Sequence, residues 1–554
     1  MSFHVPAYAT GSGSGFKVSA SDVAGRDSFF SCPMGQALMA RKKAGTLYPN
    51  DRSRWRSTFD KASTLNFALR DLTYAQHRGG DTNAEIAAND ELTDAQRHFL
   101  RHAMAMLAEL MPEASSDAGV ELTLADEGIS SPTQLDGADG EVTAFGRHLA
   151  SADGSVHELV RMRFKPLRAA RDEDADWTAV AALALAYTAG VPASARIRIS
   201  EFSLADGEYR LAFDGDRERA RSGYTERGRP VGAVLTEGAF NPGQACSRCA
   251  FLNVCPAVPQ KRGLLGLPER AVATRYLRAS DLAAYDYCPT AFHAERVDHL
   301  PDGYDDDTYA TDRLVARARG NAVHAWLRWA HSRAPARGCI SEDLPAPDEP
   351  GSDAAAAAAG LDEGSYRLAY PYLLQHVTDC PLRLDGLEGW NLERRVTCFD
   401  PDADIVVTCT PDLTCTVSGS NVPIWRETKT AAVAPSDIEQ ALWHYPGFAL
   451  TVVLLAHDAP AVYPDAHVEL EVLTPEQSVV LHLATSDGEL IALAQKIVAG
   501  IARSFAGDLA FDRKPNAGCA SCAMHRWCDP PAPAQAAVRQ VIEDDEFGDH
   551  EPPF

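Results

Sequence analysis

The sequence predicts an α/β fold made of two related halves, each closed by its own set of four cysteines. Three observations support this prediction. Strand-like runs rich in β-branched residues are followed by apolar helices in both halves. One cysteine pattern occurs once in each half. The chain has 554 residues, 45% of them hydrophobic and 23% charged, which is enough for more than one hydrophobic core.

The charge balance excludes one class of function. The chain carries 52 Lys and Arg against 77 Asp and Glu, so its formal net charge is −25. A surface this acidic repels a polyanion, which excludes non-specific DNA binding over the whole surface. Nucleic-acid contacts would need a local basic groove or bound metal ions.

The chain has no uninterrupted apolar run of about 18 residues and no signal-like start, so we expect a cytoplasmic protein that does not contact a membrane.

The cysteines form two copies of one arrangement. Each half has a Cys-Pro pair near its start, preceded by Ala-Ser-Asp and an apolar residue, and a C-x2-C-x5-C run near its end. The two sets are Cys32, Cys246, Cys249 and Cys255 in the first half and Cys288, Cys519, Cys522 and Cys528 in the second. Disulfides explain them poorly in a reducing compartment, whereas four thiolates are a usual ligand set for an iron–sulfur cluster or for zinc.

Either metal would make each cysteine set a clasp. It would close a loop of more than two hundred residues and so join both ends of its half. The remaining cysteines fall outside both sets, and we expect them to be packed or surface thiols. They are Cys339, Cys380, Cys398, Cys409 and Cys415.

A hairpin in the second half gathers charged residues. Val406–Val417 is rich in β-branched residues and predicts a buried strand, and 418–421 a turn before a second strand over 422–429. The hairpin would bring Asp412 and Glu427 to one sheet edge, with Lys429 on the face of Glu427 because side chains alternate. Carboxylates suit Mg²⁺ or Mn²⁺. Alone, such a Glu-x-Lys would usually be an ion pair across strands.

A histidine can join these ligands. His324 lies in a helix whose apolar stripe includes Val323, Trp326 and Leu327. A lone histidine there is normally a packed core residue, but an imidazole beside the carboxylates would favour Mn²⁺. Between Asp437 and Leu455 the sequence predicts one helix.

In their order, these motifs resemble the RecB-like branch of the PD-(D/E)XK nucleases, especially the CRISPR-associated RecB-like exonucleases and the AddB-type nuclease domain. The resemblance spans about residues 275–530. It implies two restriction-endonuclease-like domains, each a central mixed sheet flanked by helices, with a 4Fe-4S cluster in each cysteine set. It also implies an active site made of His324, Asp412, Glu427, Lys429, Gln440 and Tyr445, the first three binding Mn²⁺ or Mg²⁺. The family has its tyrosine four residues after the glutamine; here it is five, with His444 in the fourth place.

The resemblance implies a metal-dependent deoxyribonuclease that acts on single strands or free ends in DNA repair, CRISPR adaptation or phage defence. The chain has no G-x4-G-K-[ST] loop, so unwinding would need a helicase or another defence-system partner. Arg313, Arg317 and Arg319 are candidates for strand contacts. The competing interpretation is a non-catalytic iron–sulfur protein, either a DNA-binding or a redox-sensing scaffold.

The first half reads as a degenerate copy. Aligning Asp412 with His148 places Arg163 at Glu427, Lys165 at Lys429 and Asp176 at Gln440, so the metal carboxylates are missing. Such a half could bind phosphates or dock a partner protein. The basic residues that would contact phosphates are Arg161, Arg163, Lys165 and Arg168.

Composition places the boundaries of these parts. We predict a degenerate domain over 1–260, a linker over 261–275, an active domain over 276–530 and an acidic disordered tail over 531–554. Within the active domain, Arg333–Gly364 is rich in Pro, Ala, Gly and acidic residues, which predicts a long mobile loop.

Overall fold

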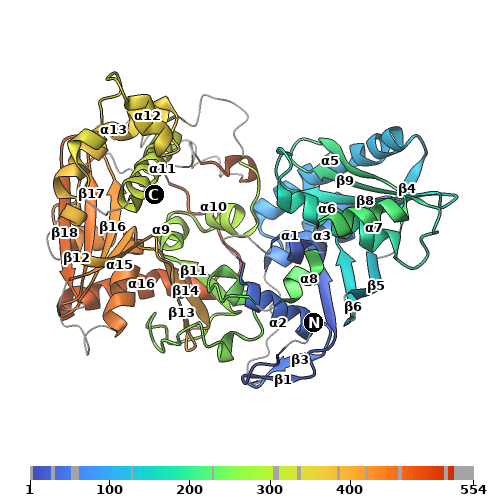
Figure 1. The fold of residues 1–554 in the computed structure, drawn as a ribbon, viewed down its shortest axis with the longest axis horizontal. Helices are drawn as coiled ribbons and strands as arrows, with labels where there is room; N and C mark the ends of the chain where they lie inside the picture. Colours follow the sequence, from blue (N-terminus) through green and yellow to red (C-terminus); the bar gives the residue numbers. More distant parts are fainter. Residues whose placement is uncertain are drawn as a thin grey trace. The chain divides into compact units, whose positions relative to one another are not determined.

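The computed structural model describes residues 4–25, 31–51, 61–125, 129–135, 138–227, 230–236, 238–302, 311–333, 338–383, 387–417, 422–458, 465–516, 519 and 522–528. The chain divides into two compact units: Met1–Pro259 with Ala294–Asp302, and Gln260–His293 with Gly303–Phe554. Each unit combines helices with mixed sheets (Figure 1), which confirms the predicted α/β class. The predicted tail lies outside the described residues.

The elements of the first unit are β1 (Ala9–Gly11), β2 (Phe16–Ser19), α1 (Ala20–Ala24), α2 (Pro33–Lys43), β3 (Leu47–Pro49), α3 (Lys61–His77), α4 (Thr82–Ala88), α5 (Asp94–Ala118), β4 (Leu122–Leu124), β5 (Ile129–Leu135), β6 (Ala138–Ala144), β7 (Arg147–Ser151), β8 (Val156–Arg163), α6 (Asp172–Ala186), β9 (Arg196–Ser203), β10 (Tyr209–Gly215), α7 (Arg217–Glu226) and α8 (Pro230–Leu235).

The elements of the second unit are β11 (Arg275–Arg278), α9 (Ala279–Tyr287), α10 (Pro289–Phe292), α11 (Thr311–Ser332), α12 (Ser352–Ala358), α13 (Glu363–Asp379), β12 (Leu387–Leu392), β13 (Val396–Asp400), β14 (Ile405–Cys409), β15 (Leu413–Val417), β16 (Pro423–Thr430), α14 (Ile438–His444), α15 (Pro446–Asp458), β17 (His467–Leu473), β18 (Ser478–Ala484) and α16 (Gly488–Gly507). Short 3-10 or π turns occur at Gln244–Arg248, Leu252–Val254, His293–Val297, Ser341–Asp343, Pro381–Arg383 and His525–Trp527.

The two units share one sheet topology. Their five-stranded sheets have the orders β10-β9-β8-β7-β4 and β18-β17-β16-β15-β12. In each, the second and third strands are parallel and the other neighbours antiparallel. Their three-stranded sheets, β2-β6-β5 and β11-β14-β13, each begin with a parallel pair. The first unit adds the β1–β3 pair.

An apolar helical segment connects the parallel strands in each unit. In the first it is α6, whose residues from Val180 to Ala186 are all buried in the core. In the second, α15 fills this place, and its buried face includes Phe448, Val452 and Leu454. A parallel pair needs such a crossover, and a helix apolar on all sides is the expected result of burial under a sheet.

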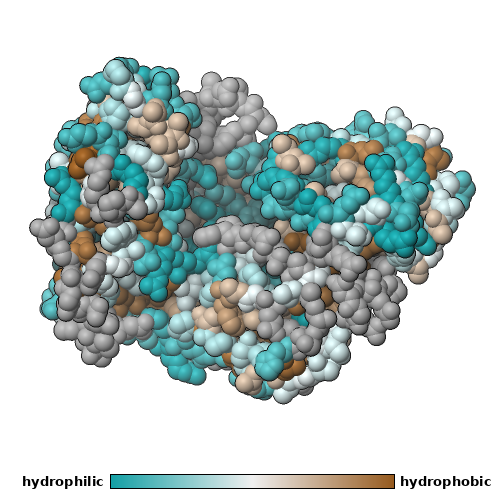
Figure 2. Space-filling model, in the orientation of Figure 1, coloured by the Kyte–Doolittle hydropathy of each residue, from teal (hydrophilic) through white to brown (hydrophobic). Residues whose placement is uncertain are grey.

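Among the residues that the structure describes, helix α16 of the second unit is long and apolar enough to cross a membrane by length and composition. Ala494, Ile497 and Val498 on this helix are buried, and it packs against α15 and α9, as a core helix does. The visible face of each unit is mostly hydrophilic, with hydrophobic residues scattered in small groups (Figure 2).

Two elements of the predicted site region are interrupted. The strand expected over 406–417 is two strands, β14 and β15, which belong to different sheets. Pro411 lies in the break and has no N–H to donate to a ladder. The helix expected over 437–455 is likewise divided into α14 and α15 at Tyr445, because Pro446 cannot continue the hydrogen bonding of α14.

Two predicted loops are packed. In the predicted linker 261–275, Leu264 and Leu265 are buried and the Lys261 N–H donates to the Phe399 carbonyl at 2.8 Å, within the second unit. The predicted mobile loop 333–364 includes α12, and its residues Leu344 and Ala356 join a core cluster with α11 and α13. The alanines of this segment have a high helix propensity, and they form α12 although the neighbouring Pro and Gly residues favour a loop.

Candidate active site

Four charged side chains converge at one end of the β15–β16 hairpin. Leu413 pairs with Arg426, so the next residues outward, Asp412 and Glu427, lie at the same edge of the sheet. Lys429 follows on β16, on the same face as Glu427. His324 comes from the middle of α11.

Asp412 is held from two sides. Its Oδ1 lies 3.1 Å from Nδ1 of His324, and its Oδ2 accepts the Thr428 backbone N–H at 2.7 Å. Burial opposes the charge on this carboxylate, but His324, Lys429 and the Thr428 N–H together outweigh burial and hold the pKa of Asp412 at about 2. The charge of Asp412 in turn raises the pKa of His324 above 6.5. The aspartate is therefore ionised at neutral pH, which a metal ligand requires.

Glu427 is buried on the opposite face of β16 from Thr428. Its Oε2 accepts from Lys429 Nζ at 3.0 Å and its Oε1 from the Thr451 hydroxyl of α15 at 3.2 Å. Burial raises the pKa of Glu427, and repulsion from Asp412 adds to the rise while Lys429 opposes it. The two carboxylates thus lie within electrostatic range of each other, and a cation between them would relieve their repulsion.

The charge on Lys429 is supported by the carboxylates. Burial alone would lower its pKa, but Glu427 and Asp412 outweigh burial and raise the pKa of Lys429. Tyr445 acts in the same direction, so it lies near this ammonium. Lys429 is therefore a fixed positive charge beside Glu427 and Asp412.

A small pocket opens beside Asp412, and His324, Arg328, Glu393 and Thr428 contribute to its wall. Arg328 Nη1 lies 2.9 Å from Glu393 Oε2, and its side chain remains half exposed. The Glu393 backbone N–H donates to the Asp412 carbonyl at 3.1 Å. A guanidinium thus stands next to the carboxylates, and guanidinium groups bind phosphates well.

The other expected contact residues are placed differently. Gln440 is exposed at the start of α14, where its Oε1 accepts the Ser436 N–H at 2.6 Å. The guanidinium of Arg319 stacks over the Tyr372 ring at 4.8 Å, and Arg317 is exposed. For Arg313 the structure describes the helical backbone alone.

The first cysteine set comes together in the first unit. Cys32 caps α2, and its Sγ accepts the Gly35 and Asn241 N–H groups, each at 3.4 Å. Burial raises the pKa of Cys249 to about 12, and the three other thiols of the set, Cys246, Cys255 and Cys32, add to the rise. The four sulfurs therefore lie within electrostatic range of one another.

The second set repeats this arrangement. Burial raises the pKa of Cys528 to about 11, and Cys288, Cys522 and Cys519 add to the rise, against Arg513. The Asn516 N–H donates to the Cys519 Sγ at 3.3 Å.

An asparagine side chain makes an equivalent hydrogen bond in both units. Asn516 Nδ2 donates to the carbonyl of Tyr287, and Asn241 Nδ2 donates to the carbonyl of Ser31. Each acceptor is the residue just before the lone cysteine of its set.

The corresponding hairpin of the first unit lacks the two carboxylates at the matching positions. Arg147 pairs with Val160 as Leu413 pairs with Arg426, so Gly146 and Arg161 stand where the second unit has Asp412 and Glu427. This register corrects by two residues the alignment predicted from sequence. A Cβ on Gly146 would lie 2.5 Å from the Val160 carbonyl oxygen, so no aspartate fits there without a backbone shift.

Two arginines of this hairpin form ion pairs with carboxylates of the same unit. Arg161 Nη1 lies 3.1 Å from Asp174 Oδ1, and its guanidinium stacks over the Trp177 ring at 4.5 Å. Arg163 pairs with Asp174 and Glu201. Buried carboxylates of the same unit therefore already pair with both guanidinium groups, and phosphate contacts by Arg161 and Arg163 stay a prediction. Lys165 and Arg168 are exposed.

Several residues around the site were not predicted. Thr451 holds Glu427 from a separate helix, and no local pattern marks it. Arg328 lies four residues after His324, so helix periodicity alone would have placed it on the same face. A buried His/Cys group in the same unit also went unrecognised, although its spacings, H-x7-C and H-x3-C, resemble those of metal ligands.

The shifted pKa of His324 predicts a pH dependence. Because the pKa is above 6.5 in the folded protein, the His324–Asp412 pair stabilises the metal-free fold below about pH 6.5, and this contribution is lost as pH rises through the folded pKa. In thermal unfolding with EDTA, the Tm difference between wild type and His324→Gln should shrink from about pH 6 to about pH 9. Parallel curves for the two proteins would contradict this assignment.

Comparison with known proteins supports a nuclease-like second unit. Residues 277–529 match the family model described as the PD-(D/E)XK nuclease superfamily. Members of that superfamily are typically metal-dependent nucleases that act on nucleic acid, so the match suggests a nuclease in this part of the chain. A search of curated proteins gave no match.

Proposed function

We propose that the second unit is a Mg²⁺- or Mn²⁺-dependent nuclease that hydrolyses DNA phosphodiester bonds. One observation carries this proposal: Asp412, Glu427 and Lys429 converge at the hairpin end inside the region that matches the nuclease superfamily. A buried ion pair would need only Glu427 and Lys429. The additional carboxylate of Asp412, with His324 beside it, makes the set suitable for a cation.

The donor set fits a hard divalent cation. Asp412 and Glu427 offer carboxylate oxygens, which both Mg²⁺ and Mn²⁺ accept, and His324 offers an imidazole, which favours Mn²⁺. A bound ion of this kind lowers the pKa of a water molecule and neutralises charge on the phosphate.

The protein groups around the ligands would position the reaction. The Thr428 N–H and the Thr451 hydroxyl fix the orientations of Asp412 and Glu427. Lys429 keeps its proton and can stabilise negative charge that develops on the phosphate. Arg328, half exposed at the pocket, can bind a neighbouring phosphate. Tyr445 would support Lys429, and Gln440 would act from the start of α14.

The proposal includes a 4Fe-4S cluster in each cysteine set. Each set gathers four thiols, and backbone N–H groups point at the sulfurs, which stabilises thiolates. Zinc would hold four thiolates on one atom, about 3.8 Å apart. Among the described residues, the groups with three or more ligand atoms within 4.8 Å of one another contain no member of either set. A four-iron cluster binds its thiolates on separate irons, so wider spacing supports it.

We interpret the first unit as a degenerate copy of the second. Three shared features support the view that the two units arose by duplication: the strand order, the asparagine hydrogen bond and the cysteine set. Gly146 and the paired arginines support loss of chemistry. The first unit would then serve as a scaffold or dock a partner, such as a helicase, in a cytoplasmic pathway of repair or defence.

The test is cleavage of end-labelled single-stranded and duplex DNA by the purified full chain with Mn²⁺, Mg²⁺ or EDTA. We expect cleavage with either metal, faster on single strands or from free ends, and none in EDTA. Lys429→Ala should slow cleavage by about 10²–10³-fold, because it removes a charge that acts on the transition state. Cleavage by Lys429→Ala at the wild-type rate would refute the site, and a wild type that binds DNA without cutting would favour the scaffold function.

A further inference from the structure

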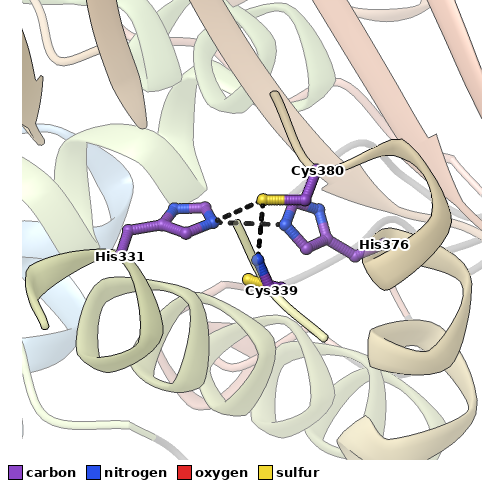
Figure 3. Close-up of side chains that lie close together, drawn as sticks. All are labelled: His331, Cys339, His376 and Cys380. Carbon is purple, nitrogen blue, oxygen red and sulfur yellow. Dashed lines mark hydrogen bonds between the residues drawn. The ribbon is translucent and has the colours of Figure 1, made fainter. Parts of the chain in front are cut away.

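A second group of ligand-type side chains lies outside the candidate active site in the second unit. His331, Cys339, His376 and Cys380 are all buried, and one ligand atom of each lies within 4.8 Å of those of the others. Figure 3 shows the two imidazoles and the Cys380 sulfur directed toward a common centre, with Cys339 beside it. These cysteines were expected to be simple packed or surface thiols.

Local structure explains why these residues meet. His331 is in the last turn of α11, and Cys339 follows on the segment leaving that helix. His376 and Cys380 stand four residues apart at the end of α13, so they share one face of it. Because α11 and α13 pack together in one core cluster, the two pairs face each other.

The distances match a tetrahedral zinc site. With Zn–N near 2.05 Å and Zn–S near 2.3 Å, two nitrogen ligands lie about 3.3–3.4 Å apart and a nitrogen and a sulfur about 3.6 Å apart. Nε2 of His376 lies 3.3 Å from Nε2 of His331, and Cys380 Sγ lies 3.5 Å from the same His331 nitrogen. A Cys2His2 set at these spacings selects zinc over Mg²⁺ or Mn²⁺, which prefer oxygen ligands.

A carboxylate orients one of the ligands. Nδ1 of His376 lies 2.8 Å from Oε1 of buried Glu471 on β17, and a carboxylate can only accept, so this nitrogen carries the proton. The lone pair of Nε2 then faces the centre of the group. Thr428 donates to Oε2 of Glu471 at 3.0 Å and so fixes the carboxylate. Outer carboxylates of this kind are typical of histidine ligands to zinc.

We propose that His331, Cys339, His376 and Cys380 bind one structural zinc ion, distinct from both cysteine clasps and from the proposed catalytic metal. The ion joins the ends of α11 and α13 and anchors the segment between them. His331 and His324 are two turns apart on α11, and Thr428 lies between Glu427 and Lys429 on β16. The zinc thus fixes the helix and strand that carry the active-site residues.

The test is the zinc and iron content per chain, measured by mass spectrometry on the untagged full chain. Cys380→Ser and His376→Gln should each lose one zinc equivalent relative to wild type and keep the iron. Cys415→Ser is the matched control, because Cys415 is also a buried thiol but lies on β15, outside the group. It should keep all its zinc. The difference between proteins identifies this site even if a cysteine clasp also takes up zinc.

A second measurement uses the wild type alone, in case a variant folds poorly. Stripping zinc with a chelator should lower the Tm, and one equivalent of Zn²⁺ per chain should restore it where Mn²⁺ does not. Equal zinc in wild type and Cys380→Ser, or a wild type that holds no zinc and gains no stability from it, would overturn the proposal. Neither readout depends on DNA cleavage, so the nuclease proposal stands or falls separately.

Discussion

Asp412→Asn is expected to slow DNA cleavage by about 10²–10³-fold, with the fold intact. The amide has the shape of the carboxylate and can still accept the Thr428 N–H, which now comes to Oδ2 at 2.7 Å. It lacks the charge that holds a divalent cation and that supports the proton on His324. Single-turnover cleavage rates at saturating Mn²⁺ would measure the effect.

The same variant separates catalysis from stability. In EDTA, Asp412→Asn removes the repulsion that helps to raise the pKa of buried Glu427, so the Tm should stay near that of wild type although the His324 pair is lost. With Mn²⁺, the rise in Tm seen for wild type should be small or absent. Asp402→Asn is the control: Asp402 is an exposed carboxylate of the same unit, 2.8 Å from Arg262. A full Mn²⁺ response in Asp412→Asn would show that Asp412 holds no metal.

The hairpin of the second unit was predictable because its residues alternate and are rich in β-branched types. That pattern placed Glu427 and Lys429 on one strand face, and the structure agrees. The interruptions at Pro411 and Pro446 were missed because the apolar pattern continues on either side of each proline. Both prolines are visible in the sequence, and a prediction that weighed their missing N–H groups against the apolar pattern would have placed the breaks there.

The register of the first unit could not be read from its pattern. The predicted alignment differs from the observed one by two residues, which moves Arg163 from the place of Glu427 to that of Lys429. A shift of two residues keeps every side chain on its face, so alternation cannot detect it. The pairing of the strands detects it directly.

The His/Cys group was missed for a different reason. Cys339 lies in a segment whose Pro and Gly content predicted a mobile loop, and its partners come from helices on either side of that segment. Ligands spread over three elements become a site only when those elements pack together. The pairs His331/Cys339 and His376/Cys380 had visible spacings, but no strand or helix pattern joined them.

Cys528→Ser is expected to destabilise the second unit strongly. If Cys288, Cys519, Cys522 and Cys528 bind one cluster, they close a loop of more than two hundred residues, and opening it should lower the free energy of unfolding by about 5 kcal/mol by the chain-entropy argument used for disulfides. For a unit of this size that corresponds to a fall in Tm of roughly 10–20 °C. Calorimetry and iron content would measure both losses, and a wild-type preparation should be brown.

Because each unit has its own cysteine set, the two clasps can be tested against each other. Cys32→Ser should lower the unfolding transition of the first unit and remove its iron, while Cys528→Ser does the same only in the second. Each variant is thus the control for the other, and Cys415→Ser controls for loss of a buried thiol without a cluster. If both variants kept their iron, or if both transitions moved together in each variant, the units would not be independently clasped. A colourless wild type that contains zinc in both sets would show that the metal is zinc and not an iron–sulfur cluster. The predicted loss of stability would be unchanged, because loop closure depends on the cysteine ligands and not on which metal they bind.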